Sequence, residues 1–293
     1  MIKRKIKRAL FDSLVKIKWS KRSNSTFKSA DHVRQLDNFD KFGIIKIDQN
    51  FSEFADYILT EYVEKILNNQ NTKFPTIKMP SGSEEMRLLL SLNDRKISDF
   101  ILRKEISGLL ETFYGRRCYL RQDPYYQRIE AKTEYIYNKS NQYFHVDRYM
   151  QLNIMVLMKD LNEKESHTEY LISSHKRRPF DFLLHKTDVE CQREIKKNNY
   201  KIFKSVGKKG DVFLFNSMGI HRLNYVSGTT RNVLYLLFTN GHNLYDYINT
   251  DSQNLNFIDN QNFETINRKS DKTVFYEGTA SKGGNYQFFN FQK

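Results

Sequence analysis

The chain has 293 residues, of which 39% are hydrophobic and 14% aromatic, with only 12 glycines and 4 prolines. These proportions exclude a disordered, collagen-like or low-complexity chain. A chain of this length can bury about three-quarters of its unfolded surface, so it can form a core without metal or disulfide staples. Its two cysteines, Cys118 and Cys191, stand far apart in the sequence, which excludes a disulfide framework and a cysteine-based zinc site.

Much of the formal net charge of +14 lies in residues 1–22, which hold nine basic residues and one acid, Asp12. That segment contributes +8, which leaves +6 for the rest of the chain. Its apolar residues recur at helical spacing: Ile2, Ile6, Leu10, Leu14 and Ile17. The pattern predicts a basic amphipathic helix, which either lies on an anionic membrane or packs its apolar stripe on the domain. Binding to nucleic acid is the third interpretation of this segment, because no motif of a nucleic-acid-binding module is present.

No uncharged apolar run approaches the length of a membrane span, and the N-terminus lacks the apolar stretch of a secretory signal. We therefore expect a cytoplasmic protein. The first interpretation of residues 2–22 adds peripheral contact with a membrane surface.

In the N-terminal third, residues 23–38 are polar and are interpreted as a linker. A short strand is predicted over 43–47 and a helix over 54–66, followed by a loop over 68–84 that is rich in Asn, Thr, Pro, Ser and Gly. Two further helices are predicted over 85–92 and 98–114, the second ending at Gly115, where a helix stop uses glycine.

After Gly115 the hydrophobic period changes to two. Strands are predicted near 118–129, 133–138, 142–147, 150–158, 168–173, 201–206, 211–215, 221–226 and 231–239, with a helical, charged insert near 180–198. Helices followed by many strands predict an α+β chain with a β-sandwich or barrel. We divide it into an N-terminal segment 1–38, a main domain 39–240 and a tail 241–293 that is a cap, a partner contact or partly disordered.

Three side chains of the strand half can hold a metal ion. His145 and Asp147 stand two residues apart on a predicted strand and so project to one face. His221 opens a later strand that would run beside them in a closed sheet. Two imidazoles and one carboxylate form the facial triad that leaves open positions on iron(II) for a co-substrate and oxygen.

Arg231, ten residues after His221, opens the next predicted strand. Its planar fork can bind a carboxylate in bidentate fashion at a fixed distance from the metal. A metal triad with a remote carboxylate clamp is what 2-oxoglutarate requires. Zinc could use the same three ligands for hydrolysis, but hydrolysis has no need of Arg231.

On these residues, the stretch 39–240 resembles the phytanoyl-CoA dioxygenase-like branch of the iron(II)/2-oxoglutarate oxygenases. The matching segments are 42–47, 119–124, 145–147, 157–161, 172–176 and 207–238. The resemblance implies a double-stranded β-helix (jelly-roll or cupin-like) core flanked by N-terminal helices. It also implies a dioxygenase that uses Fe(2+), 2-oxoglutarate and O2 and releases succinate and carbon dioxide. Because halogenating members lose the carboxylate ligand, Asp147 favours hydroxylation or another oxidation.

The chain departs from the family pattern at two places. The usual Pro-Gly-Ser-His turn is replaced by Ile172-Ser173-Ser174-His175. The Ser or Thr that family members often place two residues after the distal His is Leu223, so another polar group must help the arginine to hold the co-substrate. By strand alternation we predict Tyr126 and Asn153 for this role, although each can equally be a plain sheet residue.

The sequence leaves the substrate open among a small molecule, a sugar and a lipid-linked compound. The alternatives to an oxygenase are a zinc hydrolase with the same ligands and a non-catalytic basic protein that binds membrane or nucleic acid on a decayed barrel. The intact set of His145, Asp147, His221 and Arg231 argues against decay.

Overall fold

The structure is a computed structural model that describes residues 30–68, 76–78, 84–90, 94–114, 117–120, 124–131, 144–145, 151–176, 193, 195–239, 252–259, 263–269 and 287–290. Several predicted features lie outside these residues: the amphipathic segment 1–22, the strand over 133–138, Asp147 and most of the insert near 180–198.

As predicted, the α-helices with defined bounds all lie before Gly115, although three strands stand between them in the chain. They are α2 (Ala30–Phe42), α3 (Ser52–Ile58), which continues through a π-helical stretch η1 (Leu59–Glu64) into α4 (Lys65–Leu67), then α5 (Arg95–Leu102) and α6 (Lys104–Tyr114). The linker predicted over 23–38 is wrong from Ala30 onward, because that part belongs to helix α2 and buries Leu36. The single helix predicted over 98–114 is two helices, separated at Arg103, where the backbone is extended (ψ 139°).

The strands form two sheets. In chain order they are β1 (Ile44–Lys46), β2 (Thr76–Lys78), β3 (Glu84–Leu89), β4 (Arg117–Leu120), β5 (Tyr125–Glu130), β6 (Gln151–Leu157), β7 (His167–Leu171), β8 (Ile202–Lys204), β9 (Val212–Asn216), β10 (His221–Asn224), β11 (Thr230–Thr239), β12 (Ser252–Asp259), β13 (Phe263–Lys269) and β14 (Gln287–Asn290). A short 3-10 turn, η2 (Ser174–Lys176), follows β7.

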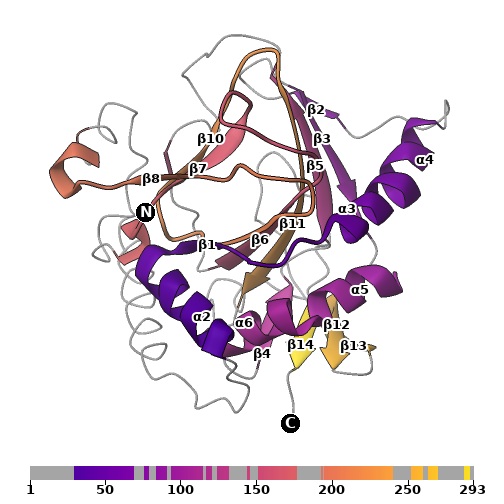
Figure 1. Cartoon of the computed structure of the whole chain (residues 1–293). Helices are drawn as coiled ribbons and strands as arrows, with labels where there is room; N and C mark the ends of the chain where they lie inside the picture. The colour runs from indigo at the N-terminus through magenta and orange to yellow at the C-terminus, as the bar shows by residue number, and fades with distance from the viewer. Residues whose placement is uncertain are drawn as a thin grey trace.

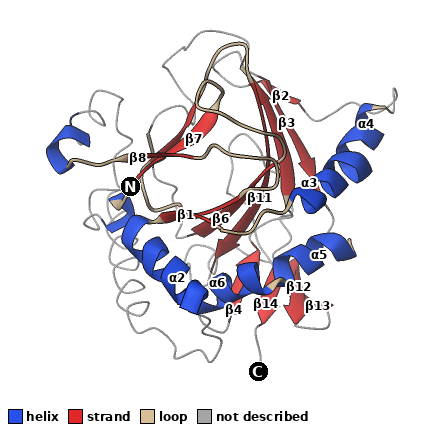
Figure 2. Cartoon of the chain, viewed as in Figure 1, coloured by secondary structure: helices blue, strands red, loops and turns tan. Residues whose placement is uncertain are grey.

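The large sheet has the order β1-β9-β6-β11, and β5 and β4 both pair with β11. The small sheet has the order β10-β7-β8. The strand predicted over 118–129 is therefore two strands, and the helix predicted over 85–92 is strand β3, which pairs with β5. Within the tail, β12–β14 continue the large sheet next to β4 (Figure 2).

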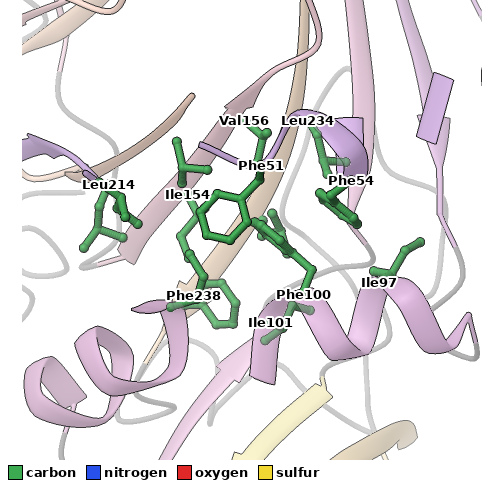
Figure 3. Close-up of a cluster of buried hydrophobic side chains, with 14 of the residues drawn as sticks. Phe51, Phe54, Ile97, Phe100, Ile101, Ile154, Val156, Leu214, Leu234 and Phe238 are labelled. Carbon is green, nitrogen blue, oxygen red and sulfur yellow. The ribbon is translucent and has the colours of Figure 1, made fainter. Parts of the chain in front are cut away.

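The hydrophobic core lies between the large sheet and the helices (Figure 1). Alternate residues of β6, β9 and β11 point into it, among them Ile154, Leu214 and Leu234. Aromatic rings from the helical side close it: Phe54 stacks on Phe100 with ring centroids 4.1 Å apart (Figure 3). The period of two thus divides each central strand between this core and the opposite face of the sheet.

Among the helices that the structure describes, none is long and apolar enough to cross a membrane.

Candidate active site

The opposite face of the large sheet carries a cavity of about 180 Å³. Side chains of β3, β5, β6, β9 and β11 form one wall, and the small sheet supplies the other through β7 and β10, together with His145. The interior of the two-sheet structure is therefore a polar pocket at this position rather than a continuation of the apolar core.

His145 and His221 meet at this cavity although they are far apart in the sequence. Their backbones form an antiparallel bridge with hydrogen bonds of 2.9 Å in both directions. Such a pair places the two side chains on the same face of the sheet. The imidazole centroids are 4.5 Å apart, which allows two ring nitrogens to reach one metal ion.

The ring of His221 is oriented by its surroundings. Its Nδ1 lies 2.9 Å from the carbonyl oxygen of Gly219 and must donate to it, so Nε2 is the nitrogen that carries the metal-binding lone pair. Phe215 and Tyr170 pack on the ring with centroids 5.5 and 6.4 Å away. Carbonyl contacts of this kind are typical of metal-binding histidines.

The neighbouring residue Arg222 contacts both strand β7 and the residue that precedes His145. Its Nε donates to Glu169 of β7 at 2.7 Å, and its guanidinium lies 4.3 Å from the ring centroid of Phe144, which precedes His145. Burial would raise the pKa of Glu169, but the interactions with His167 and Arg222 outweigh burial and lower this pKa. Glu169 therefore stays ionised and holds Arg222 in place.

Arg231 reaches the same cavity from β11 and is only 2% exposed. Its Nη1 donates to Gln127 at 3.1 Å, and its Nη2 donates to Thr168 at 2.9 Å and to Tyr235 at 2.6 Å. None of its contacts among the described residues is to a carboxylate, and its Nε has no hydrogen-bond partner there. A buried cation with neutral neighbours and an unused donor fits the carboxylate of a ligand.

Of the two residues predicted to assist Arg231, Asn153 faces the cavity and Tyr126 does not. Asn153 is 4% exposed, and its Oδ1 has no hydrogen-bond partner among the described residues, so a ligand can use the amide. The prediction for Tyr126 is wrong: it lies in the helix-side core, where burial raises its pKa to about 12. At the start of β5 both faces are buried, because Tyr125, Tyr126 and Gln127 are all buried, and the cavity-facing residues are Tyr125, Gln127 and Ile129.

The hydroxyl missing at Leu223 is supplied from the adjacent strand. Thr168 is the cross-strand partner of Leu223, and it is the residue whose hydroxyl accepts from Arg231. The sequence gives no sign of this role for Thr168, because strand register cannot be read from a single sequence. Strand alternation could have predicted Tyr235, because it lies four residues after Arg231 on the same face of β11.

The other departure from the family pattern is accommodated locally. Ser173 takes a positive φ of 67° where the family has glycine. Ser174 is fully buried and its hydroxyl accepts a hydrogen bond from the backbone of Ile220, next to His221, at 2.7 Å.

The third predicted metal ligand, Asp147, lies outside the described residues. Within the described part of the chain, no group of three His, Cys, Asp or Glu side chains is placed to hold a metal ion. The donor chemistry that is described, two facing imidazoles beside an unpaired buried guanidinium, fits iron(II) with 2-oxoglutarate.

Comparison with known proteins gives a family match over the same region. The model of the phytanoyl-CoA dioxygenase family matches residues 51–225, which contain His145, Asp147 and His221 but stop before Arg231. A search among curated proteins finds no match.

Solved structures show the same fold. The apo form of EctD from S. alaskensis superposes with a TM-score of 0.55 at 16% identity, covering 74% of this chain and 79% of that chain. The epimerase SnoN, in complex with Fe3+, alpha ketoglutarate and nogalamycin RO, gives 0.52 at 11% identity, covering 88% and 98%. At these identities the likeness concerns the fold alone, and it confirms the predicted jelly-roll core with flanking helices.

Proposed function

The chain belongs to the phytanoyl-CoA dioxygenase family of iron(II)- and 2-oxoglutarate-dependent oxygenases, and we propose that it hydroxylates a carbon of a small-molecule, sugar or lipid-linked substrate. Succinate and carbon dioxide are the co-products. The observation that carries the proposal is the buried guanidinium of Arg231, which contacts no carboxylate of the described residues and lies in the cavity that His145 and His221 also line. A zinc hydrolase would have no use for such a cation.

In this proposal His145 and His221 hold the iron, with Asp147 as the third ligand from the sequence. Bound iron with 2-oxoglutarate supplies the activation of oxygen for oxidation of a substrate carbon. Arg231 binds the distal carboxylate of 2-oxoglutarate, and Thr168 and Tyr235 hold the guanidinium in position. Asn153 offers its amide to the co-substrate from β6.

The proposal is tested by succinate release from 2-oxoglutarate with added iron(II), which needs no identified substrate if uncoupled turnover occurs. His145→Ala, Asp147→Ala and His221→Ala should abolish turnover because each removes a metal ligand. Arg231→Ala should mainly raise the KM for 2-oxoglutarate. Wild-type turnover in all four variants would refute the proposal, and turnover in none of the proteins, wild type included, would favour a non-catalytic protein.

We also propose that residues 2–22 bring the enzyme to an anionic membrane surface, which would suit a lipid-linked substrate. The support is the +8 charge and apolar spacing of the segment. Flotation with acidic liposomes should recover the full-length protein and not a chain that starts at Ser23. Equal failure of both to bind would remove this proposal and leave a soluble substrate.

A further inference from the structure

A chain of buried polar side chains leads away from Arg231 across three strands. The guanidinium donates from Nη1 to the amide oxygen of Gln127 at 3.1 Å, and the amide nitrogen of Gln127 donates to Glu85 at 2.7 Å. Arg87 contacts the same carboxylate oxygen through its Nε. Glu85 and Gln127 are 1% and 6% exposed, and all four side chains line the cavity.

The orientation of the Gln127 amide follows from its neighbours. A guanidinium is a donor only and an ionised carboxylate an acceptor only. The amide oxygen must therefore face Arg231 and the amide nitrogen must face Glu85. A glutamine side chain can accept a hydrogen bond from the guanidinium and donate one to the carboxylate without carrying a charge.

Strand register shows what Gln127 prevents. Glu85 pairs with Ile129, and Ile129 pairs with Arg231, so Glu85 and Arg231 lie on one row of the sheet face. Two strand spacings put their Cα atoms about 10 Å apart, a span that extended Glu and Arg side chains can bridge. A direct bidentate pair between them would be strong in this buried site, and a ligand carboxylate would have to displace it.

We propose that Gln127 is a positioning residue that keeps the buried carboxylate of Glu85 off Arg231 and so leaves the guanidinium to the distal carboxylate of 2-oxoglutarate. This inference rests on the proposed function. Arg87 has a related positioning role. Its ion pair with Glu85 balances the charge of that carboxylate and limits the repulsion that the carboxylate exerts on the co-substrate.

The test exchanges the two side chains. The double variant Glu85→Gln/Gln127→Glu has the composition and net charge of the wild type, but its carboxylate contacts Arg231 directly. Binding of 2-oxoglutarate to the iron(II)-loaded protein is measured anaerobically by calorimetry, with iron affinity and thermal denaturation measured in parallel. Glu85→Gln alone serves as the matched control, because Arg231 keeps its neutral acceptor.

We expect the exchange to weaken 2-oxoglutarate binding by about tenfold or more, with iron affinity retained and uncoupled turnover restored at saturating 2-oxoglutarate. Glu85→Gln should bind 2-oxoglutarate at least as tightly as the wild type, because it keeps the neutral acceptor of Arg231 and removes a buried negative charge. Wild-type binding by the exchanged variant, or an equal loss in Glu85→Gln, would overturn the inference while leaving the proposed function intact. A wild type that does not bind 2-oxoglutarate would overturn both. If the exchanged variant does not fold, Gln127→Glu alone tests the same point.

Discussion

Within the part of the chain that the structure describes, Arg231 donates to neutral oxygen and sulfur atoms of Gln127, Thr168, Tyr235 and Met155 and to no carboxylate. Burying a guanidinium in this way is unfavourable unless a ligand supplies the counter-charge. In the proposed function, the distal carboxylate of 2-oxoglutarate supplies this counter-charge when it binds to Arg231.

Arg231→Lys keeps the charge but loses the planar fork. We expect it to weaken 2-oxoglutarate binding by about tenfold or more, because an ammonium cannot form two parallel hydrogen bonds with a carboxylate. Arg128→Lys on the outer side of β5, where Arg128 pairs with Glu130, is the control. Calorimetry on the iron-loaded proteins measures the affinity for 2-oxoglutarate. An undiminished affinity in Arg231→Lys would show that the planar guanidinium does not bind the carboxylate in bidentate fashion.

Thr168→Val should raise the KM for 2-oxoglutarate by about tenfold with kcat retained, since a hydrogen bond to a charged group is lost. The double variant Thr168→Val/Leu223→Thr should recover part of this loss, because Leu223 faces Thr168 across the ladder. Steady-state kinetics measures both. An unchanged KM in Thr168→Val would exclude a role for this hydroxyl in the clamp.

At the residue scale, the sequence predicted the side chains with distinctive chemistry and failed where both strand faces are buried. His145, His221, Arg231 and Asn153 lie around one cavity, whereas Tyr126 was assigned to the wrong face in place of Gln127. In β5 the sequence alternation carries no sign of which face is polar, because Tyr125 and Tyr126 are both aromatic.

Among the connecting elements, the turn between β9 and β10 determines where His221 lies. A Cβ on Gly219 would stand 1.8 Å from the Tyr170 hydroxyl, and the Gly219 carbonyl accepts from His221. Gly219→Ala should therefore cost about 1–3 kcal/mol and weaken iron binding. Gly228→Ala is the control for iron binding: its φ of +74° strains an alanine and lowers stability, but its Cβ meets nothing within 4 Å, so iron affinity should be unchanged. Urea denaturation and iron titration check this, and normal iron affinity in Gly219→Ala would contradict it.

The start of helix α5 gives a pH-dependent contribution to stability. Asp94 caps the helix through the backbone amides of Lys96 and Ile97 and accepts from the hydroxyls of Tyr57 and Tyr62 at 2.5 Å each. Burial would raise the pKa of Asp94, but these hydrogen bonds outweigh it and lower the pKa. The hydrogen bond to Asp94, together with burial, raises the pKa of Tyr57 to about 12.

Because the folded-state pKa of Asp94 is lowered, its contribution is present at neutral pH and is lost as the pH falls below about 4 through the folded-state value. The contribution of Tyr57 has the opposite sign: it is complete below pH of about 10 and is lost as the pH rises through the raised value. Asp94→Asn should cost about 1 kcal/mol at pH 7 and less at pH 3. A cost that is equal at both pH values, measured by urea denaturation, would contradict this account.

At the element scale, the sequence predicted most strands after Gly115 but misassigned β3. Its residues alternate between the cavity (Glu85, Arg87) and the core side (Met86, Leu88), yet they are all good helix formers. The break between helices α5 and α6 at Arg103 could not be predicted from the sequence either, because neither glycine nor proline stands there.

At the scale of the whole molecule, the helices cover one face of the large sheet and leave the other for the cavity (Figure 1). The general architecture followed from the order of helices and strands. The strand order followed only in part: the metal triad placed the His221 strand beside His145, and the two residues do form a bridge. Nothing in the sequence indicated that Thr168 faces Leu223 or that the tail extends the sheet beside β4. These pairings depend on contacts between distant segments.

The central claim is that His145, His221 and Arg231 form one site for iron(II) and 2-oxoglutarate. Anaerobic titration of the wild type with both, monitored by the visible charge-transfer band of such complexes, tests it most directly. The account predicts a band that saturates at a single iron per chain, is absent in His221→Ala, and requires more 2-oxoglutarate in Arg231→Lys. No band from the folded wild type at saturating iron and 2-oxoglutarate would contradict it.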